Sequence, residues 1–102
     1  MDEDPHLKVR LRERSKGATS FDAAATIAFA AAIRNMRTAQ GLPQDTLAGE
    51  ARIERSPMGK IERGQHIPNL SAILKLAAAL VCTAADLVAA PEALLPPAYG
   101  AL

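Results

Sequence analysis

The sequence predicts an all-α fold, on three observations about its composition. Alanine, the residue that favours helices most, accounts for 22 of the 102 residues. Valine, isoleucine, threonine and aromatic residues, which favour strands, are scarce, and tryptophan is absent. A single cysteine excludes a disulfide scaffold, and an apolar fraction of 49% excludes a wholly disordered chain. The length is that of one small domain with a thin core, which a partner chain would help to stabilise.

Five helices are predicted between residues 19 and 90. The first runs from a capping box of Thr19 and Asp22 to about Gln40. Gly41 suits the left-handed residue that ends a helix. Apolar side chains at helical spacing predict the buried face of this helix. They are Phe29, Ile33 and Met36, with Gln40 in the same row.

Two short helices follow, joined by a turn at residues 51–53. The second helix is expected over about 43–50, because the proline at its start is tolerated in the first position of a helix. The third is expected over about 55–63 and ends at Gly64. Pro57 falls in the first turn of the third helix and need not break it.

The fourth helix is predicted over about 70–80, with Asn69 as its cap. A second capping box, Thr83 with Asp86, begins a short fifth helix that is expected to end before Pro91. An apolar stripe is assigned to the fourth helix. Its members are Leu70, Ile73, Leu74, Ala77 and Leu80.

Residues 19–90 are therefore expected to form the domain, with an irregular tail at residues 91–102. Residues 1–18 are interpreted as a flexible basic arm. Their alternating apolar and basic residues also permit a strand that pairs with a partner chain, or contacts with DNA phosphate. The apolar run at residues 23–33 is too short to cross a bilayer. We therefore expect a cytoplasmic protein that does not enter a membrane.

The charge of the chain is small in total but unevenly distributed. There are 12 basic and 11 acidic residues, for a net charge of +1, which by itself indicates no partner. Six of the basic residues lie within residues 34–64 and five within residues 1–16. The middle of the chain therefore carries local basic groups that the total conceals.

One set of residues between positions 33 and 87 is informative about function because of its spacing. It comprises Ile33-Arg34, Arg37, Gly41-Leu42, Gln44, Leu47-Ala48, Ile53, Met58, Ile61-Glu62-Arg63-Gly64, Pro68-Asn69-Leu70, Leu74, Ala77 and Leu80. Each piece alone is weak, but together the stretch resembles the Cro/C1-type (XRE, lambda-repressor-like) helix-turn-helix DNA-binding family over about half the chain. Small Ala48 and Ala51 agree with the close helix crossing of that motif. The outer face of the third helix has a composition that suits a polyanion.

The resemblance implies a sequence-specific DNA-binding transcriptional regulator of the repressor type. As a homodimer on a palindromic operator in double-stranded DNA, it would insert the helix at about 55–63 into the major groove. Arg55 is the foremost candidate base contact, because its fork can bond O6 and N7 of guanine together. The further candidate base contacts are Ser56, Gly59 and Lys60. The candidate phosphate contacts are Gln44, Arg63 and Asn69.

The resemblance also assigns a structural role to Arg37 and Glu62, which match a buried ion pair between the first and third helices of this family. Surplus apolar residues of the last helix and the tail are the expected dimer contacts. They are Ala84, Leu87, Val88, Leu94 and Leu95.

Three positions depart from the family pattern. Arg52 stands where the turn usually has glycine, so it must accept a positive φ or another turn geometry. Pro43 replaces the serine that usually caps the second helix. Glu54 occupies an N-cap position, where its charge favours the helix dipole but repels phosphate.

Other classes of function remain open or are set aside. The chain could be the antitoxin of a toxin–antitoxin pair with a protein partner at its tails, a restriction–modification controller protein, or a protein-interaction module that does not bind DNA. An enzyme is not expected, because no nucleophile–base pair is readable. Gly59 and Gly64 have P-loop spacing without the lysine that should follow. No metal or other cofactor is expected either, because His6, His66 and Cys82 are too few for a zinc site.

Overall fold

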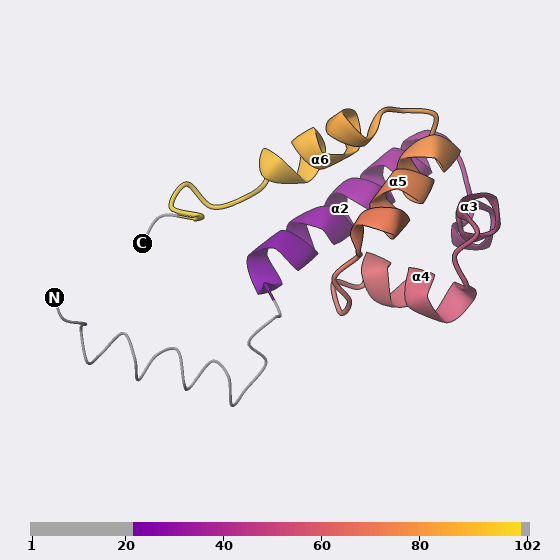
Figure 1. Ribbon diagram of the computed structural model, residues 1–102, viewed down its shortest axis with the longest axis horizontal. Helices are drawn as coiled ribbons and strands as arrows, with labels where there is room; N and C mark the ends of the chain where they lie inside the picture. The colour runs from indigo at the N-terminus through magenta and orange to yellow at the C-terminus, as the bar shows by residue number, and fades with distance from the viewer. Residues whose placement is uncertain (1–21, 101–102) are drawn as a thin grey trace, which may run out of the picture.

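The computed structural model describes residues 22–100, and this part of the chain forms five helices and no strand. In chain order they are α2 (Ala23–Ala39), α3 (Gln44–Ala51), α4 (Arg55–Glu62), α5 (Leu70–Ala79) and α6 (Ala84–Glu92). The predicted all-α fold is confirmed (Figure 1). The expected basic arm at residues 1–18 lies outside the described residues.

The long helix α2 organises the core. It packs against both α6 and α4, while α3 packs against α5 and α4, and α5 packs against α6. Figure 1 shows α6 and α4 on opposite sides of α2, with α5 crossing it. Each of the five helices contributes one fully buried side chain, and the C-cap residue of α5 contributes a sixth. These side chains are Ile33, Leu47, Met58, Leu76, Leu80 and Leu87.

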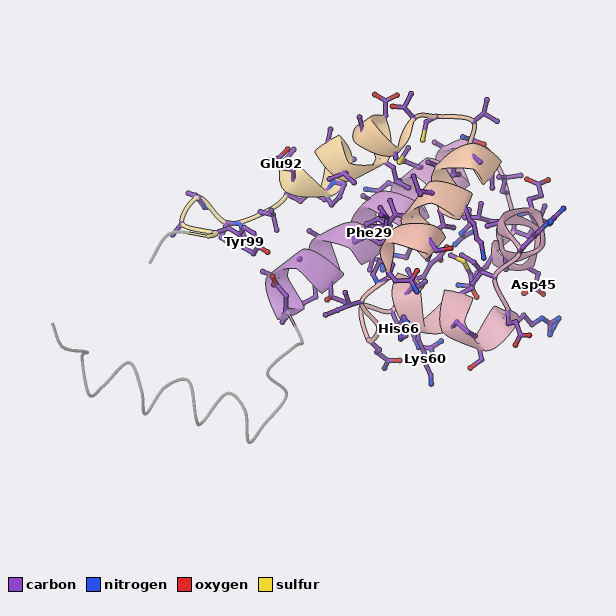
Figure 2. All side chains as sticks on the ribbon, in the orientation of Figure 1. Phe29, Asp45, Lys60, His66, Glu92 and Tyr99 are labelled. Atoms are coloured by element: carbon purple, nitrogen blue, oxygen red, sulfur yellow. The ribbon has the colours of Figure 1, made fainter. Side chains whose placement is uncertain are left out.

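The start of α2 differs from the predicted capping box at Thr19. Helix α2 begins at Ala23 with Asp22 as its N-cap, and the Asp22 Oδ1 accepts the N–H of Ala25 at 3.0 Å. Aspartate is a stronger N-cap than threonine. The hydroxyl of Tyr99 donates to the other carboxylate oxygen of Asp22 and so brings the C-terminal tail to the start of α2 (Figure 2). The Ala25 amide first, and then Tyr99, hold the pKa of Asp22 below its ordinary value of 3.8.

The apolar stripe predicted for α5 is wrong in two of its members. Leu70 and Leu74 are 68% and 51% exposed, while Leu76, which the prediction omitted, is fully buried. The face that packs on the core has the spacing i, i+3, i+4 and i+7, which gives a narrow row on one side of a helix. It consists of Ile73, Leu76, Ala77 and Leu80.

Helix α6 does not end before Pro91, as the sequence predicted. It begins with the predicted capping box of Thr83 and Asp86 but continues to Glu92, with Pro91 buried inside it. A proline in the last turn removes one hydrogen bond, but Pro91 is buried in the face of the fold where α6 packs against α2. Leu87 is fully buried in the core. It is therefore not available as a dimer contact, which corrects that part of the prediction.

Four helices end in a left-handed residue. Gly41 and Gly64, both predicted as helix stops, have φ of 70° and 73°. Arg52 and Val81 have φ of 57° and 58°. Of the two alternatives that the sequence left open for Arg52, the structure has the positive φ, whereas the positive φ at Val81 was not predicted. Each end has a bond from an amide to a carbonyl five residues earlier, which is typical of this cap. The bonds join Leu42 to Arg37, Ile53 to Ala48, Gln65 to Lys60 and Cys82 to Ala77.

Candidate nucleic-acid interface

The helices α3 and α4 form a compact unit around a short turn. Leu47, Ala48 and Ala51 on α3 are buried, as are Met58 and Ile61 on α4. The two alanines leave room for the helices to pack closely. Their N-terminal ends lack side-chain caps, because neither Pro43 nor Glu54 makes a capping hydrogen bond. The loss of the cap at Pro43 is as the sequence predicted, while the repulsion of phosphate by Glu54 remains a prediction.

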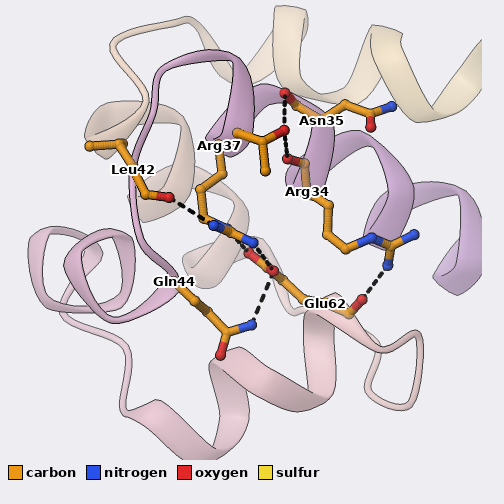
Figure 3. Close-up of polar contacts among 7 residues, drawn as sticks. Arg34, Asn35, Arg37, Leu42, Gln44 and Glu62 are labelled. Carbon is orange, nitrogen blue, oxygen red and sulfur yellow. Dashed lines mark hydrogen bonds and ion pairs between the residues drawn. The ribbon is translucent and has the colours of Figure 1, made fainter.

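A buried polar network ties α4 to α2 (Figure 3). Arg37 Nε donates to Glu62 Oε2 at 2.7 Å, and Arg37 Nη2 donates to Glu62 Oε1 at 3.0 Å. The Glu62 side chain is only 2% exposed and that of Arg37 15%. The hydrogen bond with Glu62 raises the pKa of Arg37. Arg37 Nη1 also donates to the Leu42 carbonyl at 2.7 Å, and Arg34 donates to the Glu62 carbonyl. The pair inferred from the resemblance is thus present and holds the C-terminal end of α4 against α2.

Gln44 has a role in this network that the sequence interpretation missed. Its side-chain amide donates to Glu62 Oε1 at 3.0 Å, so three helices meet at one carboxylate (Figure 3). A buried carboxylate has more acceptor sites than one arginine fork fills. This surplus of acceptor sites was the signal from which a second donor to Glu62 could have been predicted. The donor end of the Gln44 side chain is therefore occupied inside the protein. A phosphate contact by this residue remains a prediction.

The outer face of α4 is exposed at Arg55, Ser56, Lys60 and Arg63. Figure 2 shows Lys60 on the side of α4 away from the core. Gly59 is an exception, because it is buried. A Cβ atom at Gly59 would lie 2.9 Å from Nη1 of Arg63, whose guanidinium covers the glycine. Gly59 is therefore covered by Arg63 in the free protein, and a contact between this residue and a base remains a prediction.

An ion pair joins the two helices at this exposed face. Arg55 Nη2 lies 3.1 Å from Asp45 Oδ2, with the two side chains 75% and 62% exposed. Asp45 is in the first turn of α3, and Arg55 is the first residue of α4. The sequence interpretation missed this pair, because ten residues and a turn separate the partners. The candidate base-reading arginine thus has a carboxylate beside it.

The remaining candidate contacts lie where α4 ends and α5 begins. Arg63 Nε donates to the Gln65 side chain at 3.0 Å. Asn69 caps α5, as predicted, by accepting the Ala72 N–H at 2.8 Å. A polar hollow of about 240 Å³ lies between α4 and α5. Its charged or titratable lining residues are Arg52, His66 and Lys75, none of which the sequence singled out as a DNA contact.

Within residues 22–100 no group of three or more His, Cys, Asp or Glu side chains is placed to hold a metal ion. Cys82 is partly buried against the core, and burial raises the pKa of its thiol, with a smaller contribution from the charge of Asp86. No single described helix is long and apolar enough to cross a membrane. Helices α5 and α6 meet that test only together, and they are bent by 106°.

The fold and this exposed face define a helix-turn-helix protein. The family described as "Helix-turn-helix domain" matches residues 28–94, and the chain belongs to it. Domains of this class bind DNA through the second helix of the motif, which here is α4. This membership supports the assignment of the protein to the DNA-binding regulators. It also confirms the family resemblance drawn from the sequence.

Solved structures of similar chains agree. The restriction-modification controller protein C.AhdI from Aeromonas hydrophila is 44% identical, with a TM-score of 0.59, over 61% of this chain and 94% of that chain. Two structures of the clp gene regulator ClgR from Corynebacterium glutamicum are 23% and 22% identical, with TM-scores of 0.64 and 0.66. They cover 68% and 71% of this chain, and 73% and 92% of their own. At that identity they show the fold alone. No curated protein matches the chain.

Proposed function

We propose that the protein is a cytoplasmic, sequence-specific transcriptional regulator of the repressor type, which binds a palindromic operator as a homodimer. One observation carries the proposal. Helix α4 exposes Arg55, Ser56 and Lys60 on one face, while Glu62 at its end is buried and bonded to α2 and α3. A recognition helix needs both features, because base edges are read only when the side chains are held in a fixed register.

The base and phosphate contacts follow from this placement. Arg55 at the N-terminal end of α4 reads guanine through O6 and N7. Ser56 and Lys60 lie on the same exposed face and contact bases or phosphates. Arg63, Asn69 and the first amides of α3 at Gln44 contact phosphates, since helix N-termini attract anions.

The homodimer follows from the small reach of one helix. A single recognition helix covers only a few base pairs, and a two-fold dimer places two such helices about 34 Å apart in successive major grooves. Exposed apolar side chains remain on α6 and beyond it. Val88 is 45% and Leu94 54% exposed, so both remain candidates for the dimer contact.

A second, narrower function is favoured by the similarity to C.AhdI. That controller protein is 44% identical, and the match spans 94% of its length. We propose on this basis that the operator belongs to a restriction–modification gene pair. The proposal requires that the selected site lie upstream of a restriction or methyltransferase gene next to the gene for this protein.

Selection of bound sequences from random DNA tests the proposal, with the mass of the free protein measured alongside. The expected result is an enriched palindrome and a dimeric mass. Arg55→Ala should reduce discrimination at one guanine by about 1–3 kcal/mol. Arg55→Lys is the matched control, because it keeps the charge but loses the bidentate fork. It should retain the dependence of affinity on salt while discriminating poorly.

Absence of enrichment, together with affinity that does not depend on salt, would contradict the DNA-binding function. The protein-interaction module would then be the better description. An enriched site with a monomeric mass would contradict the homodimer alone.

A further inference from the structure

The ion pair between Asp45 and Arg55 has no evident structural purpose. Both side chains are more than half exposed, at 62% and 75%. Ion pairs this exposed contribute little to folding stability, because water screens them and two long side chains lose freedom. The pair nevertheless joins the two helices of the motif at the face assigned to DNA. A role in binding explains its position better than a role in folding.

We propose that Asp45 is a positioning residue that sets the base selectivity of Arg55. This inference rests on the proposed DNA-binding function. The carboxylate engages Nη2 of Arg55 at 3.1 Å, while a guanidinium carries five N–H donors in one plane. Enough donors remain free for O6 and N7 of guanine. The carboxylate fixes the orientation of that plane before DNA arrives, so less side-chain freedom is lost on binding.

The charge of Asp45 strengthens the same effect. A carboxylate at the interface repels the phosphates of any DNA sequence, which weakens non-specific binding. At the correct site the contact between Arg55 and guanine compensates for this repulsion, and at a wrong base it does not. Selectivity gained by penalising the wrong partner is a general device of recognition. The charge of Asp45 therefore weakens binding to all DNA, and only the contact between Arg55 and guanine offsets that loss at the operator.

Glu54 provides a matched control. It is adjacent to Arg55 in the sequence, exposed, and also acidic. Among the described residues, however, Arg55 forms its ion pair with Asp45 and not with Glu54. Glu54→Gln removes the same charge from the same face without removing the partner of the arginine. Any effect of charge alone should appear in both variants.

The experiment uses the full chain and the selected operator. The dissociation constant is measured at fixed salt for the operator, for operators in which the guanine read by Arg55 is replaced, and for random DNA. Asp45→Asn should lower discrimination at that guanine by about three- to tenfold, a part of what a bidentate contact provides. It should also tighten binding to random DNA. Glu54→Gln should tighten binding to random DNA but leave discrimination at the guanine unchanged. Asp45→Glu, which keeps a carboxylate at this position, should retain most of the discrimination that Asp45→Asn loses.

The outcomes separate this inference from the function on which it rests. If Arg55→Ala abolishes discrimination but Asp45→Asn preserves or sharpens it, the positioning role is wrong and the DNA-binding function stands. If the unmodified protein shows no preference among these DNAs, the proposed function itself fails. In the Arg55→Ala background, Asp45→Asn should no longer change discrimination. If Asp45→Asn lowered discrimination as much in the Arg55→Ala background as in the unmodified protein, Asp45 would act independently of Arg55 and the inference would be overturned.

Discussion

Replacing Glu62 by alanine removes the carboxylate at which α2, α3 and α4 meet. The side chain is 2% exposed and accepts from Arg37 Nε at 2.7 Å, from Arg37 Nη2 at 3.0 Å and from Gln44 Nε2 at 3.0 Å. In the variant, the guanidinium of Arg37 loses its counter-charge while it stays largely buried. The amide of Gln44 loses an acceptor as well.

Breaking a buried ion pair by removing one partner costs about 3–5 kcal/mol. The lower end applies here, because Arg37 is 15% exposed and keeps its bond to the Leu42 carbonyl at 2.7 Å. We therefore expect a loss of about 3 kcal/mol in the free energy of unfolding. For a domain of this size, that loss lowers the melting temperature by about 12–24 °C. Small domains are stable by only about 5–15 kcal/mol, so this loss removes about a fifth to three fifths of the total.

Urea and thermal unfolding followed by circular dichroism measure this loss, and DNA affinity is measured below the melting point. Glu54→Ala is the control, because that carboxylate is exposed and makes no capping bond. Glu62→Gln keeps an acceptor oxygen and should lose about half as much, which provides a measurement if the alanine variant does not fold. The reasoning is refuted if Glu62→Ala unfolds within about 0.5 kcal/mol of the unmodified protein, as a typical surface variant does.

Three further predictions concern the helix ends. Val81→Gly should raise the free energy of unfolding by about 1 kcal/mol, because a β-branched residue at φ 58° is strained and its side chain, 87% exposed, packs on little. Gly41→Ala, at φ 70° with open space around it, should lower the free energy of unfolding by a similar amount in the same melts. Equal stability of the two variants and the unmodified protein would contradict the argument from backbone strain. The lowered pKa of Asp22 means that its charge stabilises the fold above pH 3.8 and that this contribution is lost as pH falls through the folded-state pKa. The stability advantage over Asp22→Asn should therefore vanish in acid, and an advantage that persists there would refute the linkage.

The helix ends show which parts of the fold the sequence can predict. Capping by Asn69, Thr83 and Asp86 is a local property, and the structure has these caps where the pattern predicts them. Glycine stops are equally local. Val81 was missed because its left-handed conformation is imposed by the packing of α5 against α6, against the preference of the residue itself. Pro91 was misjudged for a similar reason, since tertiary burial outweighed its tendency to end a helix.

The rotation of α5 could not be settled by hydrophobicity. The helix contains more apolar residues than its neighbours can cover, so several stripes of similar spacing fit the sequence. Leu70 and Leu74 satisfy the periodic pattern as well as Leu76 does, yet only Leu76 is buried. The choice depends on where α3 and α6 contact α5, and this is information that a single helix does not contain.

The candidate site divides in the same way. Arg37 and Glu62 were inferred from the family resemblance, and the exposure of Arg55, Ser56 and Lys60 agrees with the expected face. Two of the contacts that were missed join side chains of different helices, and the third is the cover of Gly59 by the side chain of Arg63. Gln44 bonds to Glu62, Asp45 pairs with Arg55, and Arg63 covers Gly59. None leaves a periodic signal, because each depends on the angle between α3 and α4 or on a single rotamer.

Two of these contacts reduce the positive charge that the domain presents to DNA. Within the described residues, the charge of Arg37 is compensated by Glu62 inside the core, and that of Arg55 by Asp45 at the surface. The general attraction of this domain for phosphate is therefore weaker than its count of arginines suggests. Because non-specific binding depends on that attraction, we expect a regulator with this charge arrangement to depend more strongly on the proposed base contacts. The near balance of charge then favours selectivity and gives no reason to doubt DNA binding.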